Sequence, residues 1–277
     1  MDRVLVTGAS GTLGGALTSR LADDGWGVLA ASRTPAEAAS ESGAIDDGAV
    51  EWVELDLVEG RGIERAVGET DAVVHAATAP RGDAEAVDVR GTERLLDAAE
   101  GAGVDHFVYP SIVGVGDIPL SYYERKREAE RAIEDSAVPS TVLRATQFHD
   151  FVDGLLGVVG KLPVWPLPTE LRVQPVDHRE VAARLIACLA DEPRGRADPV
   201  GGPVVHRLGE LASAYREARG LRRPILRLPL PGTVAKEFRA GRATCPDRAV
   251  GAVTWAEWLA ETYGGRSGDA PPSATPS

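Results

Sequence analysis

The sequence predicts an α/β fold, a Rossmann-like doubly wound parallel sheet with a small C-terminal substrate region. First, the apolar stretch 4–6 runs directly into a glycine-rich turn and then into a helical pattern. Second, apolar stretches typical of buried strands alternate with helical patterns as far as Arg144, which favours a parallel sheet with right-handed crossovers. Third, this alternation stops from Thr146 onward, which indicates a smaller, different region.

The turn after the first strand has a regular glycine spacing, Gly8-x-x-Gly11-x-x-Gly14. Leucines then recur every fourth residue, which is helical spacing, until Gly25 ends the pattern. This order of strand, turn and helix lets bare backbone approach a pyrophosphate, whose charge the N–H groups at the helix start then face. The dinucleotide contacts expected here are Gly8, Ser10, Gly11, Thr12, Leu13 and Gly14.

The rest of the first 145 residues supplies the other elements of the sheet. Residues 34–49 are small, polar and acidic, which predicts a surface loop with at most a short helix. The expected strands are residues 28–31, 50–55, 72–77, 106–111 and 140–144, and the expected helices are 63–67, 84–100 and 121–136. We therefore expect residues 1–145 to form an NAD(P)-binding Rossmann-like domain.

Residues 146–264 are expected to form a substrate-binding region that is interleaved with the sheet. An apolar helical pattern follows Thr146, and residues 162–168 hold too many prolines for a helix or a central strand. Further on, we expect helices over residues 179–189, 208–219, 232–240 and 255–263, and a strand over 225–228. Residues 265–277, rich in Ser, Pro, Gly and Ala, are expected to form a disordered tail.

The amino-acid composition and residue spacing indicate which classes of binding partner to expect. A formal net charge of −12 argues against nucleic acid, because binding to phosphate backbones relies on clustered Lys and Arg. No apolar run is long enough for membrane insertion, and the chain enters a strand without a leader pattern, so we expect a cytoplasmic protein. No metal site is expected, because Cys188 and Cys245 lie far apart and no histidine cluster has ligand spacing.

The end of the second strand indicates which cofactor binds. An NAD site favours an acidic residue there, whereas this chain has Ser32 and Arg33, which suit a 2′-phosphate. We therefore expect NADP(H). Asp56 and Leu57, after the third strand, are expected at the adenine, although Asp56 could instead cap a turn. The small-residue loop after the fourth strand should line the cofactor with Ala76, Ala77 and Thr78.

Tyr122 and Lys126 are four residues apart on a predicted helix and therefore share a face. A nearby ammonium group stabilises the phenolate form of a tyrosine, which makes it a better acid–base group, and the same lysine can hold the nicotinamide ribose. Ser111, at the end of the fifth strand, could hold a substrate carbonyl or hydroxyl. An ordinary surface helix could also carry this tyrosine and lysine by chance.

Together these motifs resemble the NmrA-like, NAD(P)H-binding branch of the atypical short-chain dehydrogenase/reductases. The resemblance covers residues 2–263 and implies Tyr122, Lys126 and Ser111 as the catalytic set, with Ser111 the weakest of the three. Relatives often carry Asn where this chain has Asp88. The segments that carry the resemblance, besides the glycine turn, are 106–115, 122–126, 143–148, 175–177, 181–182 and 201–203.

The resemblance implies an oxidoreductase that moves hydride between NADPH and a small carbonyl or quinone. The same branch includes NADP-binding redox sensors that regulate through a protein partner, which is the main alternative. A nucleotide-sugar epimerase or dehydratase is disfavoured because the C-terminal part shows no cationic pocket for a diphosphate. We expect an apolar substrate wall after the sixth strand, formed by Gln147, Phe148 and Trp165, although such aromatic residues more often belong to a core.

Overall fold

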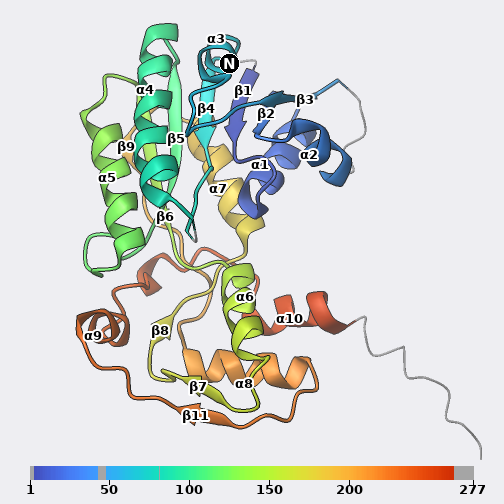
Figure 1. Ribbon diagram of the computed structural model, residues 1–277, viewed down its shortest axis with the longest axis vertical. Helices are drawn as coiled ribbons and strands as arrows, with labels where there is room; N and C mark the ends of the chain where they lie inside the picture. The colour runs from blue at the N-terminus through green and yellow to red at the C-terminus, as the bar shows by residue number, and fades with distance from the viewer. Residues whose placement is uncertain (1–2, 43–47, 81, 265–277) are drawn as a thin grey trace, which may run out of the picture.

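The computed structural model describes residues 3–42, 48–80 and 82–264, and a parallel sheet forms its centre (Figure 1). Within these ranges the strand order is β3-β2-β1-β4-β5-β6-β9, and every pairing is parallel. The strands are β1 Arg3–Thr7, β2 Gly27–Ser32, β3 Val50–Glu54, β4 Ala72–His75, β5 His106–Ile112, β6 Ser140–Ala145 and β9 Gly195–Arg196. This confirms the predicted doubly wound sheet. Its order changes direction between β1 and β4, where such sheets bind ligands.

Helices cover both faces of the sheet, because alternate side chains of each strand point to opposite sides. Val4 and Val6 pack with helices α1 and α7, whereas Leu5 packs on the other face with α3, α4 and α5. The bounds are α1 Thr12–Asp23, α2 Pro35–Ser42, α3 Ile63–Gly68, α4 Gly91–Ala102, α5 Ser121–Asp135 and α7 His178–Ala190. The predicted loop 34–49 thus contains the short helix α2, and residues 43–47 lie outside the described residues.

The helix predicted over residues 84–100 differs in the structure. It begins as a π-helix, η1 Glu85–Arg90, and continues as α4. A π turn contains one residue more than an α turn, so it shifts the side chains before it relative to those after it. Asp88 is therefore buried toward the strand ends while Leu95 and Leu96 pack under the sheet.

The C-terminal region lies beyond the carboxyl ends of the strands (Figure 1) and has its own apolar core, which includes Trp165, Tyr215 and Trp255. Its strands pair in two small sheets, β7 with β11 and β8 with β10. Its elements are α6 His149–Val159, β7 Trp165–Leu167, β8 Arg172–Val173, β10 His206–Arg207, α8 Leu208–Ala218, β11 Ile225–Arg227, α9 Thr233–Arg239, η2 Pro246–Arg248 and α10 Trp255–Tyr263. The predicted tail, 265–277, lies outside the described residues.

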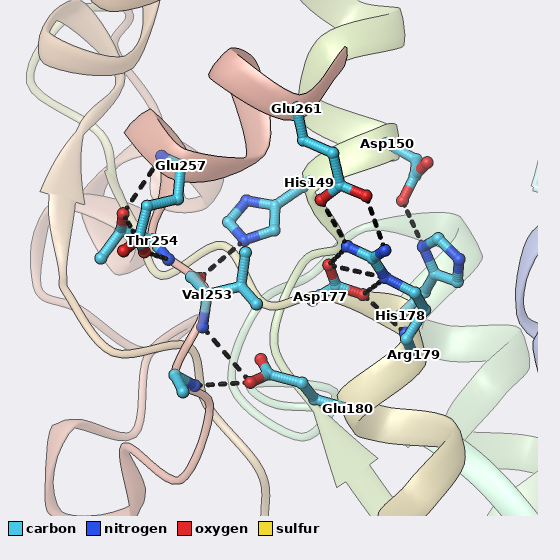
Figure 2. Close-up of polar contacts among 11 residues, drawn as sticks. His149, Asp150, Asp177, His178, Arg179, Glu180, Val253, Thr254, Glu257 and Glu261 are labelled. Carbon is cyan, nitrogen blue, oxygen red and sulfur yellow. Dashed lines mark hydrogen bonds and ion pairs between the residues drawn. The ribbon is translucent and has the colours of Figure 1, made fainter.

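The start of α7 is tied to α10 through a shared arginine (Figure 2). Asp177 caps α7 by accepting a hydrogen bond from the backbone N–H of Arg179. The Arg179 guanidinium pairs with Asp177 at 2.7 Å and with Glu261 of α10 at 2.8 Å. This network joins a helix of the sheet layer to the last helix of the C-terminal region.

The segment before α10 is held by two side chains from other helices (Figure 2). Glu180 Oε1 accepts hydrogen bonds from the N–H groups of Ala252 and Val253 at 2.6 and 3.3 Å. His149 Nε2 donates to the Val253 carbonyl at 3.1 Å, and its buried ring stacks on Trp255. His149 therefore has a packing role.

In the part of the chain that the structure describes, no helix combines the length and apolar character needed to cross a membrane.

Candidate active site

The glycine turn after β1 fits against the loop after β4 with no room for side chains. Gly8 has φ +69°, and a Cβ built on it would lie 2.7 Å from the Ala77 Cα. A Cβ on Gly14 would lie 2.0 Å from the Gly8 carbonyl oxygen. Gly11 is the N-cap of α1 and provides no side-chain hydrogen bond, so N–H groups of the first turn stay available for an anion. A dinucleotide phosphate fits this cradle.

The predicted cofactor contacts at this turn differ in exposure. Ser10, Gly11 and Thr12 are exposed at the start of α1, where a ligand can reach them. Leu13 is buried and packs in the core between α1 and the sheet. The side chain of Leu13 therefore stabilises the turn by packing in the core beneath α1.

The edge formed by the ends of β2 and β3 carries the residues predicted to bind the adenosine part. Arg33 is exposed, and Ser32 Oγ accepts a hydrogen bond from the Thr34 N–H at 3.2 Å. Asp56 caps a turn, with Oδ1 2.8 Å from the Val58 nitrogen and 3.0 Å from the Glu59 nitrogen. The Glu59 N–H is the main cause that holds the pKa of Asp56 below its usual value, with smaller contributions that include the nearby Arg33.

Asp56 thus has the turn-capping geometry that the sequence left open as its alternative role. Leu57 is buried in the core under α3 and α4. Its carbonyl accepts a hydrogen bond from Arg94 Nη1 at 2.8 Å.

Tyr122 begins a chain of short hydrogen bonds at the end of β4. Its hydroxyl lies 2.7 Å from Thr78 Oγ1, and Thr78 donates to Asp88 Oδ1 at 2.6 Å. The other Asp88 oxygen accepts from the Ala79 N–H at 2.9 Å. Thr78 is exposed, whereas Asp88 is fully buried. The chain therefore runs from the open side of the site to a buried carboxylate.

Lys126 lies on the same face of α5 as Tyr122, as predicted, but its ammonium group points inward. Nζ lies 3.0 Å from the Tyr109 hydroxyl, 3.3 Å from Asp88 Oδ1 and 3.5 Å from the Pro110 carbonyl. Burial by itself lowers the pKa of Lys126, but the hydroxyl and carboxylate groups around it raise the pKa above its usual range. The lysine therefore stays charged, with two hydrogen bonds to protein oxygens and an ion pair with Asp88.

Tyr109 completes this buried group from strand β5. Its ring is fully buried, and Lys126 Nζ lies over the ring, 4.5 Å from the ring centroid. Burial raises the pKa of Tyr109 to about 12, so its hydroxyl remains protonated near neutral pH. Tyr109 therefore accepts a hydrogen bond from Lys126 and holds the lysine in place.

Ser111 is not joined to the Tyr122 network. Its hydroxyl donates to Glu130 Oε1 at 2.5 Å, and the buried Glu130 also pairs with Arg144 and Arg127. The hydrogen bond from Arg144 is a main reason why the pKa of Glu130 lies below its usual value despite burial. The hydroxyl proton that Ser111 would donate to a substrate is thus already used in a hydrogen bond to a buried carboxylate.

His75 connects Thr7, which precedes the glycine turn, to Asp88. Thr92 Oγ1 donates to the Asp88 carbonyl at 2.7 Å and so accepts from His75 Nε2 at 3.0 Å. His75 Nδ1 then accepts from Thr7 Oγ1 at 2.6 Å, and Thr7 accepts from the Ala77 N–H at 3.3 Å. This order requires a neutral imidazole. Burial, followed by the nearby Lys126 charge, lowers the pKa of His75 to about 3.

The neutral His75 predicts loss of stability in acid. The ordinary pKa of histidine is 6.5, whereas the pKa of His75 in the folded chain is about 3. Between these two pH values the unfolded chain binds a proton at His75 and the folded chain does not. The free energy of unfolding should fall by about 1.4 kcal/mol per pH unit in this window. Urea unfolding at pH 7 and pH 5 measures how much free energy of unfolding is lost on acidification. This loss should be about 2 kcal/mol smaller in His75→Gln than in the parent chain. An equal pH dependence in both would contradict a neutral His75.

The residues predicted to form a substrate wall do not share one surface. Gln147 is partly buried, and its Nε2 donates to the Ala243 carbonyl at 3.2 Å. Phe148 is partly buried against the core between α7 and the sheet. Trp165 is fully buried in the C-terminal core beside Tyr215. The structure corrects the expectation for Trp165, because an indole without exposed surface cannot line a pocket.

Sequence reasoning does not place the side chains of Asp88, Tyr109 and His75 among the candidate site residues. Asp88 gave a signal, because it replaces an Asn that relatives often carry. Tyr109 and His75 gave none, since both sit in apolar strands and have the pattern of core residues.

The sequence also matches known proteins over the region that builds this site. A family model described as NAD(P)H-binding matches residues 8–192, which is more than half of the chain. The chain belongs to this NAD(P)H-binding family. The predicted family is therefore confirmed, and the predicted NADP(H) cofactor is confirmed as far as NAD(P)H.

Two curated relatives of this family member are reductases. The (4-alkanoyl-5-oxo-2,5-dihydrofuran-3-yl)methyl phosphate reductase of Streptomyces griseus is 33% identical over 204 residues, covering 72% of this chain and 68% of the relative. The divinyl chlorophyllide a 8-vinyl-reductase of Oryza sativa subsp. indica is 32% identical over 222 residues, covering 72% of this chain. The match covers only 54% of that second relative.

Solved structures match over almost the whole NAD(P)H-binding chain. The NADPH-dependent quinone oxidoreductase QOR2 of Escherichia coli, complexed with NADPH, has a TM-score of 0.77 and 17% identity, covering 94% of this chain and 99% of that one. The epimerase Mth375 of Methanothermobacter thermautotrophicus has a TM-score of 0.76 and 20% identity, covering 95% and 91%. At these identities both matches support the fold alone.

Proposed function

We propose that this chain is an oxidoreductase that moves hydride between NADPH and the carbonyl or quinone group of a small substrate. The observation that carries the proposal is the Tyr122 hydroxyl, which is hydrogen-bonded to Thr78 and through it linked to Asp88 and Lys126. This network lies at the carboxyl ends of the strands, where the glycine turn also lies. A positioned hydroxyl beside a nicotinamide site is what proton exchange with a substrate oxygen requires. Two relatives named as reductases support the redox class of this proposal.

The residues would divide the work as follows. The glycine turn and the start of α1 hold the pyrophosphate, and Arg33 with Ser32 holds the 2′-phosphate. Bound NADPH supplies the hydride. Tyr122 exchanges a proton with the substrate oxygen, and Lys126 keeps Asp88 and Tyr109 in place beside it. A quinone oxygen, which becomes only a weak base on reduction, can take its proton from water instead.

Preference for NADPH over NADH should depend on Arg33. Replacing it by Ser removes a charge-assisted contact worth about 1.5–3 kcal/mol, so the Kd for NADPH should rise about 10- to 100-fold. The Kd for NADH should change less than about threefold. Arg20→Ser is the matched control, because Arg20 is also exposed but lies on α1, where it pairs with Asp24. Titration calorimetry would contradict the assignment if Arg33→Ser weakened both cofactors equally.

NADPH oxidation by the purified chain against a panel of quinones and aldehydes tests the proposed function. Turnover on at least one class supports it. Tight binding of NADPH without turnover on any of them would contradict it and would favour an NADP-binding regulator.

One observation favours that regulator as a second candidate. The Lys126 ammonium group already hydrogen-bonds Tyr109 and Pro110 and pairs with Asp88, so protein groups engage it before any ribose does. A regulator needs cofactor binding but no proton exchange. A protein partner that binds the NADP-loaded and empty chain with different affinity would support this candidate.

A further inference from the structure

We propose that Asp88 stores the proton that Tyr122 exchanges with the substrate, and that Thr78 passes it between them. This inference rests on the proposed function and adds a proton path to it. The three groups form one unbroken chain, with 2.7 Å from Tyr122 to Thr78 and 2.6 Å from Thr78 to Asp88. Both distances are typical of good O–H···O hydrogen bonds.

The direction of these hydrogen bonds follows from the carboxylate at their end. A carboxylate can only accept, so the single Thr78 proton is donated to Asp88 Oδ1. Thr78 Oγ1 must then accept from Tyr122, whose own proton consequently points inward. On its open side the Tyr122 oxygen presents lone pairs. In this state the site is arranged to receive a proton from a substrate hydroxyl.

Oxidation of an alcohol balances along this path. The substrate O–H gives its proton to the Tyr122 oxygen, Tyr122 gives its own to Thr78, and Thr78 gives its own to Asp88. The C–H bond of the substrate breaks as its hydride leaves for NADP⁺, and the carbonyl forms. Asp88 ends as a carboxylic acid, and Tyr122 and Thr78 end neutral.

Reduction runs through the same atoms in reverse. A protonated Asp88 donates to Thr78, Thr78 then donates to Tyr122, and the Tyr122 proton is free to point at a substrate carbonyl. Protonation of Asp88 thus turns Tyr122 from a proton acceptor into a proton donor. An amide at this position could not do so, because it cannot hold the extra proton.

The surroundings of Asp88 leave one exit for the proton. Asp88 is fully buried, and in the described part of the chain the charged or titratable groups near it are Lys126, Tyr109, the neutral His75 and, through Thr78, Tyr122. Lys126 and Tyr109 keep their protons near neutral pH, since both have raised pKa values. Thr78 is exposed. Thr78 is therefore where the store exchanges protons with water when no substrate is bound.

The experiment measures turnover and tyrosine ionisation in the full chain. Thr78→Val keeps the shape but breaks the path, so kcat should fall about 10- to 100-fold, while Thr78→Ser should stay within about threefold of the parent. Asp88→Asn should flatten the pH profile of kcat, because the store is gone. In the cofactor-free chain, near-ultraviolet titration should show Tyr122 ionising at lower pH in Asp88→Asn, because a negative charge near the phenolate is removed.

The Tyr122 signal is identified as the part of the titration that Tyr122→Phe removes. Equal kcat in Thr78→Val and Thr78→Ser, or an unchanged pH profile in Asp88→Asn, would overturn the proton path. The titration decides even if the parent chain shows no turnover on any substrate, which would refute only the proposed function. Tyr122 ionisation that does not respond to Asp88→Asn would then refute the coupling as well.

Discussion

Replacing Tyr122 by phenylalanine should lower kcat for carbonyl reduction by about 100- to 1000-fold, because the group that exchanges the proton is lost. The ring of Tyr122 is partly exposed, and among the described residues its hydroxyl forms a hydrogen bond with Thr78. The substitution therefore leaves the packing intact. The Kd for NADPH should stay within about threefold, since an interaction made mainly in the transition state affects kcat rather than binding. Steady-state kinetics and cofactor titration together measure both quantities.

Tyr123→Phe is the matched control for this substitution. Tyr123 is the next residue of α5, but it is buried beside Val115, Ile118 and Ala243, and burial raises its pKa to about 12. Loss of its hydroxyl should leave kcat within about threefold of the parent, because it lies outside the Tyr122 network. If Tyr122→Phe and Tyr123→Phe had the same small effect on aldehydes, Tyr122 would not be the proton-exchanging group.

Quinones give a second result for the same variant. A quinone can take its proton from water, so its reduction should survive Tyr122→Phe with a loss below about tenfold. A large loss with aldehydes and a small loss with quinones would locate Tyr122 at the proton step and leave hydride transfer untouched.

Gly14→Ala should weaken NADPH binding about 100-fold or more, which equals about 3 kcal/mol. In most helices this change is favourable, because alanine is the better helix former by about 1 kcal/mol. Here the added Cβ would lie 2.0 Å from the Gly8 carbonyl oxygen and 2.9 Å from the Ala9 Cα. The turn must move away from α1, which displaces the backbone that approaches the pyrophosphate. Overpacking should also cost about 1–3 kcal/mol of stability.

Gly15→Ala separates the clash from the loss of a glycine. Gly15 is the next residue of α1, and a Cβ there meets only the Ala9 carbonyl oxygen at 3.7 Å, which is ordinary contact. Its NADPH affinity should stay within about threefold, and thermal unfolding should show equal or higher stability. If both variants bound NADPH equally well, the turn between β1 and α1 would not be the pyrophosphate site.

The order of elements could be predicted because it depends on local patterns. Apolar strands such as β1 and β5 are buried on both faces, and leucine spacing in α1 marks the side that packs on the sheet. The π turn before α4 could not be predicted, because a shift of one residue depends on what the displaced side chains meet. Asp88 meets Lys126, which lies 38 residues later in the sequence.

The candidate site divides in the same way. By itself the sequence determined the glycine turn, the cationic end of β2 and the shared helix face of Tyr122 and Lys126, because each depends on spacing within one element. Only the tertiary structure decided that Ser111 is committed to Glu130. It also decided that Lys126 is committed to Asp88, because such contacts join separate elements whose side-chain directions no local pattern records. The buried carboxylate behind Tyr122 therefore became visible only once the strands and helices were packed together.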